Sequence, residues 1–344
     1  MQADVAGALR TARLAAKFDW SWTDRDLDRF CSAAGWTPQK SDTGSAFLQT
    51  SLDVVKARAY ARLNDGWLSS ISKSGLLLIS VPVAGLPTGS GAGWFESSGD
   101  AFAAIATQLM GLLGNPDRHT AGSVPALTWL GLRNLVVSLE VDSEEIVLRF
   151  RNPVYQEWLD DAEEAEADTD DEDYEDDVDD DEQQDEEDTP RVRTAQLAPT
   201  SWGHLSEGLA AALSRMPIHQ VITFKASGGR FVQFEYVQSA KRGVELRCHV
   251  APNVEIDDRF RMSADDESRL EASGWARPRK ADDNWQRSVS WPATAADYER
   301  AAEAAVSILR DLLHVAEPLE LQVEAWIDWS SKAPDLSSLD LLTE

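Results

Sequence analysis

The residues that could support chemistry are few and scattered along the chain. A glycine-rich run, Gly89-Ser90-Gly91-Ala92-Gly93, precedes a predicted helix, where free backbone N–H groups could bind phosphate. The run lacks the Lys-Ser/Thr pair of a P-loop and the spacing of a dinucleotide-binding fingerprint. We therefore interpret it as a flexible loop.

The two cysteines predict no reactive thiol. Cys31 lies on the apolar face of a predicted helix, and Cys248 alternates in phase with its apolar neighbours on a predicted strand. Both thiols should be buried, which leaves them protonated and unreactive. Because they are far apart in the sequence, they offer neither a disulfide framework nor metal-ligand spacing, and we expect a reducing compartment.

The histidines and paired acids do not converge on one place either. No two histidines stand at metal-ligand spacing among His119, His204, His219, His249 and His314. The paired acids occupy predicted turns or helix starts, where Asp is common: Asp257-Asp258, Asp265-Asp266 and Asp282-Asp283. An active site needs converging groups. The sequence therefore predicts no catalytic residue, no metal and no cofactor, and so a protein that is not an enzyme.

One protein-binding surface follows from strand alternation. In the predicted strand over residues 230–237, Phe231, Gln233 and Glu235 project to one face and the intervening apolar residues to the other. If helices cover the apolar face, the first face is a mixed apolar and polar surface suited to protein contact, with Arg247 and His249 beside it. The alternative is a solvated sheet face with Phe231 packed by a loop.

The elements that position these residues fall into two halves. In residues 1–159, apolar periodicity predicts a helix over residues 5–16 and another from a Thr23 N-cap, with Asp26 three residues on, to Gly35. A third helix is expected over residues 99–113, with strands over residues 46–52, 57–63, 67–83, 126–130, 134–140 and 145–151. We expect this half to be an α+β domain of unknown function.

Residues 191–329 show a simpler order of elements. The expected elements are a helix over 204–215 capped by Thr200 or Ser201, strands over 220–226, 230–237 and 244–250, a helix over 263–274, strands over 276–280 and 284–291, and a helix over 294–313. This order, αβββαββα, predicts an antiparallel sheet packed by helices. Residues 319–327 are a candidate for one more strand, and we expect a flexible tail over 330–344. The fold class is thus α+β with two such domains.

The formal net charge of −28 is concentrated in one segment. Residues 160–188 hold 21 Asp or Glu and no Lys or Arg. Because like charges repel and there is little apolar surface to bury, residues 160–190 are predicted to be a disordered acidic linker. It is either an interaction segment that favours basic partners or a solubilising spacer.

The same charge argues against nucleic-acid and anionic-membrane partners. The longest apolar stretch, residues 76–86, is too short and too interrupted to span a bilayer. The first twenty residues contain no apolar core of a signal peptide. We therefore expect a cytoplasmic protein without nucleic-acid or membrane partners.

Both halves contain a helix that ends in Gly-Trp, at Gly35-Trp36 and at Gly274-Trp275. Glycine at a helix end adopts the left-handed conformation, which lets the following Trp pack back over the helix. The shared signature suggests two related units. The chain is then either a monomer whose halves form a pseudo-dimer or a homodimer.

Several marks of the second half occur together: Trp202, Leu209, Arg230-Phe231-Val232-Gln233-Phe234, Asn253, Ser273-Gly274-Trp275 and Asn284-Trp285. Through them residues 200–316 resemble the TY-Chap family, which groups YbjN-like domains with type III secretion chaperones. Where that family often has Asn-x-Tyr-Leu, this chain has Asn253-Val254-Glu255-Ile256. The first half resembles an uncharacterised actinobacterial domain in residues 18–22, 30–36 and 151–159.

The resemblance implies a non-enzymatic adaptor or chaperone-like protein near a bacterial secretion or conflict system. Its partner would be a protein: an effector, a toxin or a secretion component. A second hypothesis is an immunity or inhibitor protein whose acidic segment blocks a basic toxin. A third is an enzyme with a site between the domains.

Overall fold

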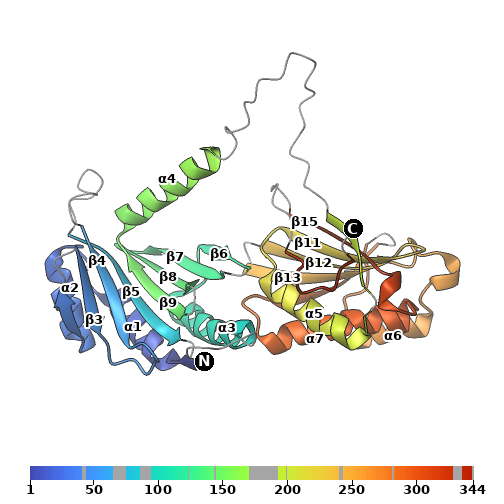
Figure 1. The fold of residues 1–344 in the computed structure, drawn as a ribbon, viewed down its shortest axis with the longest axis horizontal. Helices are drawn as coiled ribbons and strands as arrows, with labels where there is room; N and C mark the ends of the chain where they lie inside the picture. The colour runs from blue at the N-terminus through green and yellow to red at the C-terminus, as the bar shows by residue number, and fades with distance from the viewer. Residues whose placement is uncertain are drawn as a thin grey trace, which may run out of the picture. The chain divides into compact units, whose positions relative to one another are not determined.

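The computed structural model describes residues 1–40, 44–64, 75–85, 94–122, 124–142, 145–169, 193–198, 200–239, 243–280, 283–327 and 335–342. The chain forms two compact units: unit 1 is residues 1–120 with 124–184, and unit 2 is residues 121–123 with 185–344. Each unit is an antiparallel sheet packed by helices, so the predicted α+β class is confirmed (Figure 1). The glycine-rich run and residues 170–190 of the predicted linker lie outside the described residues.

Unit 1 contains one large sheet. Its strands are β1 (Gln2–Ala3), β2 (Thr37–Lys40), β3 (Ser45–Gln49), β4 (Arg58–Leu63), β5 (Leu76–Gly85), β6 (Arg118–Thr120), β7 (Ala126–Leu132), β8 (Leu135–Asp142) and β9 (Glu145–Arg151). Their order is β2-β3-β4-β5-β9-β8-β7-β6, and β1 also pairs with β5. Its helices are α1 (Val5–Lys17), α2 (Asp24–Ala34), α3 (Trp94–Leu113) and α4 (Pro153–Thr169).

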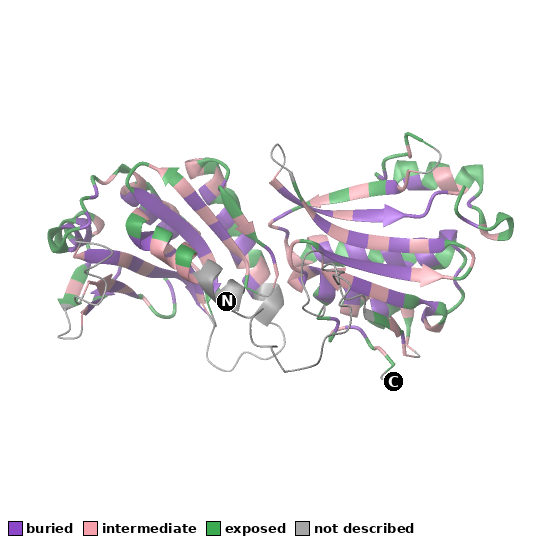
Figure 2. Ribbon diagram, turned by 90° about the horizontal axis from the view of Figure 1, so that it is seen from above, coloured by how far each residue is buried: buried purple, intermediate pink, exposed green. Residues whose placement is uncertain are grey.

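Helices α1, α2 and α3 pack on one face of this sheet. The core of unit 1 lies between that face and the three helices. Along the strands, buried and more exposed residues alternate (Figure 2). The fully buried residues include Leu48, Ala61, Ile79, Leu139 and Phe150 from the sheet and Ala12, Leu27, Phe30 and Ile105 from the helices. Alternation of this kind shows that one sheet face is covered and the other more open.

Several elements of unit 1 escaped the sequence prediction because they are short or polar. Strands β1, β2 and β6 have two to four residues each, too few to show a period of two. Residues 160–169, at the start of the predicted linker, continue α4 as helix. Thr23 makes no side-chain cap. Asp26, which is fully buried, instead accepts hydrogen bonds from Ser21 N at 2.7 Å and Ser21 Oγ at 2.9 Å.

Unit 2 contains a six-stranded sheet in the order β10-β15-β11-β12-β13-β14. The strands are β10 (Arg193–Gln196), β11 (Gln220–Ala226), β12 (Arg230–Ser239), β13 (Gly243–Val250), β14 (Trp285–Ser290) and β15 (Gln322–Ile327). The helices are α5 (Trp202–Arg215), α6 (Ala264–Ala272) and α7 (Ala295–Ser307), and a π-helical turn, Ile308–Leu312, continues α7. Helices α5 and α7 pack on each other, and the predicted cap Ser201 accepts from His204 N at 3.1 Å.

One predicted strand of unit 2 is wrong. Residues 276–280 make a single bridge, Ala276 with Gln286, and no strand. Pro278 has no N–H, so the pairing cannot continue along this segment. The candidate strand over residues 319–327 is present as β15. The order of strands and helices in unit 2 is therefore βαβββαβαβ, which contains the predicted order less one strand.

The two Gly-Trp signatures have the same local structure. Gly35 and Gly274 are left-handed, with φ of 70° and 88°. Trp36 N donates to the Cys31 carbonyl at 2.8 Å, and Trp275 N donates to the Leu270 carbonyl at 3.2 Å. Each Trp is buried against its own unit. In both halves, therefore, a left-handed glycine ends the helix and the following Trp turns back toward it, as the sequence predicted.

Candidate functional site

The five residues predicted to bind protein lie on one face of β12 and β13. In the strand register Gln233 faces His249 and Glu235 faces Arg247, with Phe231 near the start of β12. The opposite face of these strands carries the buried core residues, including Val232, Phe234, Leu246 and Cys248. Strand alternation therefore brings the five predicted side chains together.

The polar members of this face are largely tied to one another. His249 Nε2 lies 2.9 Å from Glu235 Oε1, and this hydrogen bond lowers the pKa of Glu235. Thr223 donates to Gln233 Oε1 at 3.3 Å. Only 6% of His249 is exposed, and its Nδ1 has no hydrogen-bond partner among the described residues. The face thus carries two separate polar pairs, Glu235 with His249 and Gln233 with Thr223, and Phe231 is half-buried at one end.

A groove lies on the opposite, helix-covered side of the sheet, between the edge strand β14 and helix α7. Its volume is about 460 Å³. The lining residues are Cys248, Trp275, Arg287, Ser288, Val289, Ser290, Pro292, Asp297, Arg300, Ala301 and Ala304. Trp275 is the Trp of the second Gly-Trp signature, so that motif builds one wall of the groove.

The backbone of β14 is open toward this groove. Gln286 exchanges hydrogen bonds with Ala276 on the side away from β13, with N···O distances of 2.7 and 3.2 Å. Because backbone groups alternate along an antiparallel strand, those of Ser288 and Ser290 point the same way. Both serines are exposed, and β14 is the last strand of the sheet. The edge can therefore accept another strand.

The ionisable groups that line the groove include an ion pair and a buried thiol. The carboxylate, Asp297, forms an ion pair with Arg300. Burial raises the pKa of the Cys248 thiol to about 12, so it remains protonated and unreactive, as predicted. Cys31 is also buried. Within the part of the chain that the structure describes, no group of three His, Cys, Asp or Glu side chains could hold a metal ion.

The sequence prediction found the sheet face and missed the groove. β14 was predicted as a strand, but its place at the sheet edge depends on which strands pair. The signal in the sequence was the alternation of exposed Ser288 and Ser290 with Arg287 and Val289, just before the α7 cap at Thr294.

None of the helices described is long and apolar enough to cross a membrane.

Comparison with protein families gives one match in each unit. Residues 195–327 match the family model TY-Chap3, described as T3SS (YopN, CesT) and YbjN peptide-binding chaperone 3. Residues 6–152 match DUF6301, a family of unknown function. Both resemblances drawn from the sequence are therefore confirmed at the level of the family. No curated protein and no solved structure matches the chain.

Proposed function

We propose that this protein is a non-enzymatic, chaperone-like protein that binds an extended segment of a partner protein through unit 2. The observation that carries the proposal is the open edge of β14 beside a groove of about 460 Å³. The match of residues 195–327 to a peptide-binding chaperone family supports it. The partner we favour is a component or substrate of a secretion or conflict system, met in the cytoplasm.

The groove suits a peptide that binds as a seventh strand. Its backbone would pair with the free N–H and C=O groups of Ser288 and Ser290. Alternate side chains would enter the groove against Val289, Trp275 and Ala304. Main-chain pairing supplies affinity with little dependence on sequence, so the groove would set the preference for small or apolar side chains.

The predicted sheet face would contact the other side chains of such a peptide. Arg247 pairs in register with Ser288, and His249 pairs with Gln286. A strand added to β14 would therefore extend the rows of side chains that run through Glu235 and Gln233. The outward residues of the peptide would lie beside this polar surface, where Arg247 favours acidic or hydrogen-bonding groups.

The proposal is tested with phage-displayed random 12-residue peptides selected on the full chain. We expect the selected peptides to alternate small or apolar residues with polar ones. Ala304→Arg would fill the groove and Ser288→Pro would remove an outward N–H, and each should weaken binding of the selected peptides at least about tenfold. The affinities are measured by fluorescence anisotropy.

The matched controls are Ala296→Arg and Ser288→Ala. Ala296 is exposed on α7 and does not line the groove, and Ser288→Ala keeps the backbone N–H. Both should bind the selected peptides within about twofold of the wild type, since Ala296 lies away from the pairing edge and Ser288→Ala leaves the backbone of that edge unchanged. Peptides that bind all four variants equally would contradict the site, and failure to select any peptide would contradict the function.

A further inference from the structure

The outer face of the unit 1 sheet, away from α1, α2 and α3, carries a continuous row of side chains. In register, the row crosses eight strands through Gln39, Phe47, Tyr60, Ser80, Arg149, Ser138, Thr128 and Arg118. Paired residues project to the same face of a sheet. Arg58 and Arg62 stand two residues on either side of Tyr60 and project there too.

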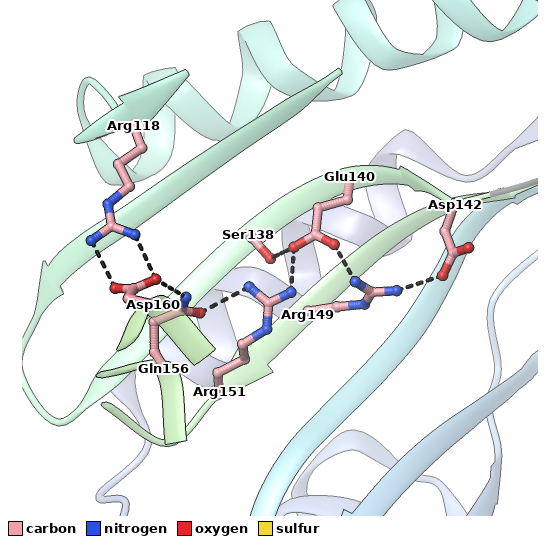
Figure 3. Close-up of polar contacts among 8 residues, drawn as sticks. All are labelled: Arg118, Ser138, Glu140, Asp142, Arg149, Arg151, Gln156 and Asp160. Carbon is pink, nitrogen blue, oxygen red and sulfur yellow. Dashed lines mark hydrogen bonds and ion pairs between the residues drawn. The ribbon is translucent and has the colours of Figure 1, made fainter. Parts of the chain in front are cut away.

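The start of α4 lies on one part of this face (Figure 3). Arg118 of β6 makes two hydrogen bonds of 2.8 Å to the Asp160 carboxylate. Gln156 links Asp160 to Arg151 at 2.8 and 3.0 Å. The carboxylates on β8 are engaged as well, because Glu140 pairs with Arg149 and Arg151, and Asp142 with Arg149. In this part of the face, each of these arginines already has a carboxylate.

The part of the face over β3 and β4 is different. Arg58 stacks on the Phe47 ring at 4.1 Å and donates to Gln39 Oε1 at 3.5 Å. Arg62 donates to the Tyr155 hydroxyl at 3.0 Å. Neither arginine pairs with a carboxylate anywhere in the described ranges, and Phe47 is 38% exposed. Phe47, Arg58, Tyr60 and Arg62 form what we call the arginine–aromatic stripe.

We propose that this stripe binds the acidic segment of the same chain, residues 170–188. The segment holds 15 Asp or Glu and no Lys or Arg in 19 residues. Arginine forks bind carboxylates with two hydrogen bonds, and stacking on an aromatic ring holds the guanidinium in place. The stripe therefore offers two positively charged guanidinium groups, held in place by aromatic side chains, to the carboxylates of the acidic segment.

Chain connectivity favours this occupant over a separate acidic molecule. The acidic segment follows α4 directly, and Tyr155 at the start of α4 already contacts Arg62. Helix α4 is roughly 25 Å long, whereas 19 extended residues reach up to about 65 Å, so the segment can return to β3 and β4. A tethered ligand acts at a local concentration of about millimolar, which outcompetes most free ligands.

The experiment uses the full chain and a fluorescent peptide with the sequence of residues 170–188. In the neutralised chain, the 15 acidic residues of the segment are replaced by Asn or Gln. At low salt, the peptide should bind the neutralised chain at least about tenfold more tightly than the wild type, because the wild-type segment competes for the stripe. Adding R58E and R62E to the neutralised chain should weaken binding at least about tenfold.

The matched control is the neutralised chain with R13E and R25E. Arg13 on α1 and Arg25 on α2 are exposed, and α1 and α2 pack on the opposite face of the sheet, so the net charge changes equally without touching the stripe. Binding should stay within about twofold. Circular dichroism verifies that each variant is folded, and R58Q with R62Q is a milder pair with the same expected direction.

Three results would overturn the proposal. Equal binding of the peptide to the wild type and the neutralised chain would show that the segment does not occupy the stripe. Equal losses in the R58E/R62E and R13E/R25E chains would show a general charge effect. Equally tight binding of an oligothymidylate of the same charge would assign the stripe to polyanions at large. The inference concerns unit 1, so its failure leaves the peptide-binding proposal for unit 2 untouched.

Discussion

The hydroxyl groups of Tyr236 and Tyr298 lie 2.8 Å apart inside unit 2, 62 residues apart in the sequence. Tyr236 belongs to β12 and Tyr298 to the first turn of α7, and 3% and 5% of these residues are exposed. Tyr236 Oη also lies 3.5 Å from the Leu213 carbonyl of α5. This short chain of polar contacts ties both helices to the sheet that carries the proposed groove.

Removing one hydroxyl should destabilise unit 2. Tyr298→Phe leaves the buried Tyr236 hydroxyl with only the long contact to Leu213, which costs about 1–2 kcal/mol of unfolding free energy. Urea denaturation followed by Trp fluorescence measures the change. Tyr60→Phe is the control, since Tyr60 is half-exposed on β4, and it should change stability by less than about 0.5 kcal/mol. An unchanged midpoint for Tyr298→Phe would show that water replaces the lost bond.

The same pair predicts loss of stability at alkaline pH. Burial raises the pKa of Tyr298 to about 12 and also raises the pKa of Tyr236. The unfolded tyrosines ionise near pH 10 while the folded ones stay protonated, so stability is full below pH 10 and falls toward pH 12. Between those values Tyr298→Phe should flatten the decline by about 1.4 kcal/mol per pH unit. If the unfolding free energies of the wild type and Tyr298→Phe fall in parallel above pH 10, ionisation of Tyr298 is not the cause of the decline.

Arg230 should be among the most sensitive positions of unit 2. It is 2% exposed and donates to the carbonyls of Leu313 at 2.8 Å and His314 at 3.1 Å, and to Ser227. Its guanidinium also stacks on Phe260 at 3.9 Å. Arg230→Lys cannot reproduce this fork and should cost about 2–3 kcal/mol in chemical denaturation. Exposed Arg279→Lys is the matched control, and an equal effect of both changes would contradict the assignment.

Gly229 should not tolerate a side chain. Its φ is 77°, and a Cβ would lie 2.0 Å from the Glu255 carbonyl oxygen. Gly229→Ala therefore combines left-handed strain with a clash against backbone, for a loss of about 3 kcal/mol or more. Gly114→Ala isolates the strain, because Gly114 has a φ of 90° with open space around it, and should cost about 1–2 kcal/mol. Similar thermal midpoints for Gly229→Ala and Gly114→Ala would show that the clash with Glu255 adds nothing to the backbone strain.

Asp160 should hold the first turns of α4 on the sheet. The hydrogen bonds from Arg118 lower the pKa of Asp160, so the pairing is intact above pH 4 and is lost as pH falls through the lowered pKa. Asp160→Asn should raise hydrogen exchange of amides 157–161 several-fold at pH 7, with a cost below about 1 kcal/mol because the pair is partly exposed. Asp161→Asn, at the exposed next position, should leave exchange unchanged. Unchanged exchange in Asp160→Asn would mean that apolar contacts alone hold the helix.

Local patterns were enough to predict most of each unit. The hydrophobic period found α1, α2, α5 and α7 and the long strands, and the Ser263 cap indicated α6. Gly35 and Gly274 marked helix ends because only glycine takes that conformation without strain. Alternation along β12 and β13 also placed Phe231, Gln233, Glu235, Arg247 and His249 on one face. These features depend on residues a few positions apart, so a sequence carries them directly.

The features that local patterns could not predict depend on which strands and side chains pair over long distances in the sequence. The position of β14 at the sheet edge, and so the groove beside α7, depends on strand order. No local period encodes that order. Trp20 and Trp22 stack at 4.6 Å in the core, where Trp22 donates to the carbonyl of Asn134, 112 residues away, at 2.7 Å. The sequence by itself determined two α+β units and an acidic segment between them. The tertiary structure decided which edges and arginines remain open, because openness depends on every element that packs nearby.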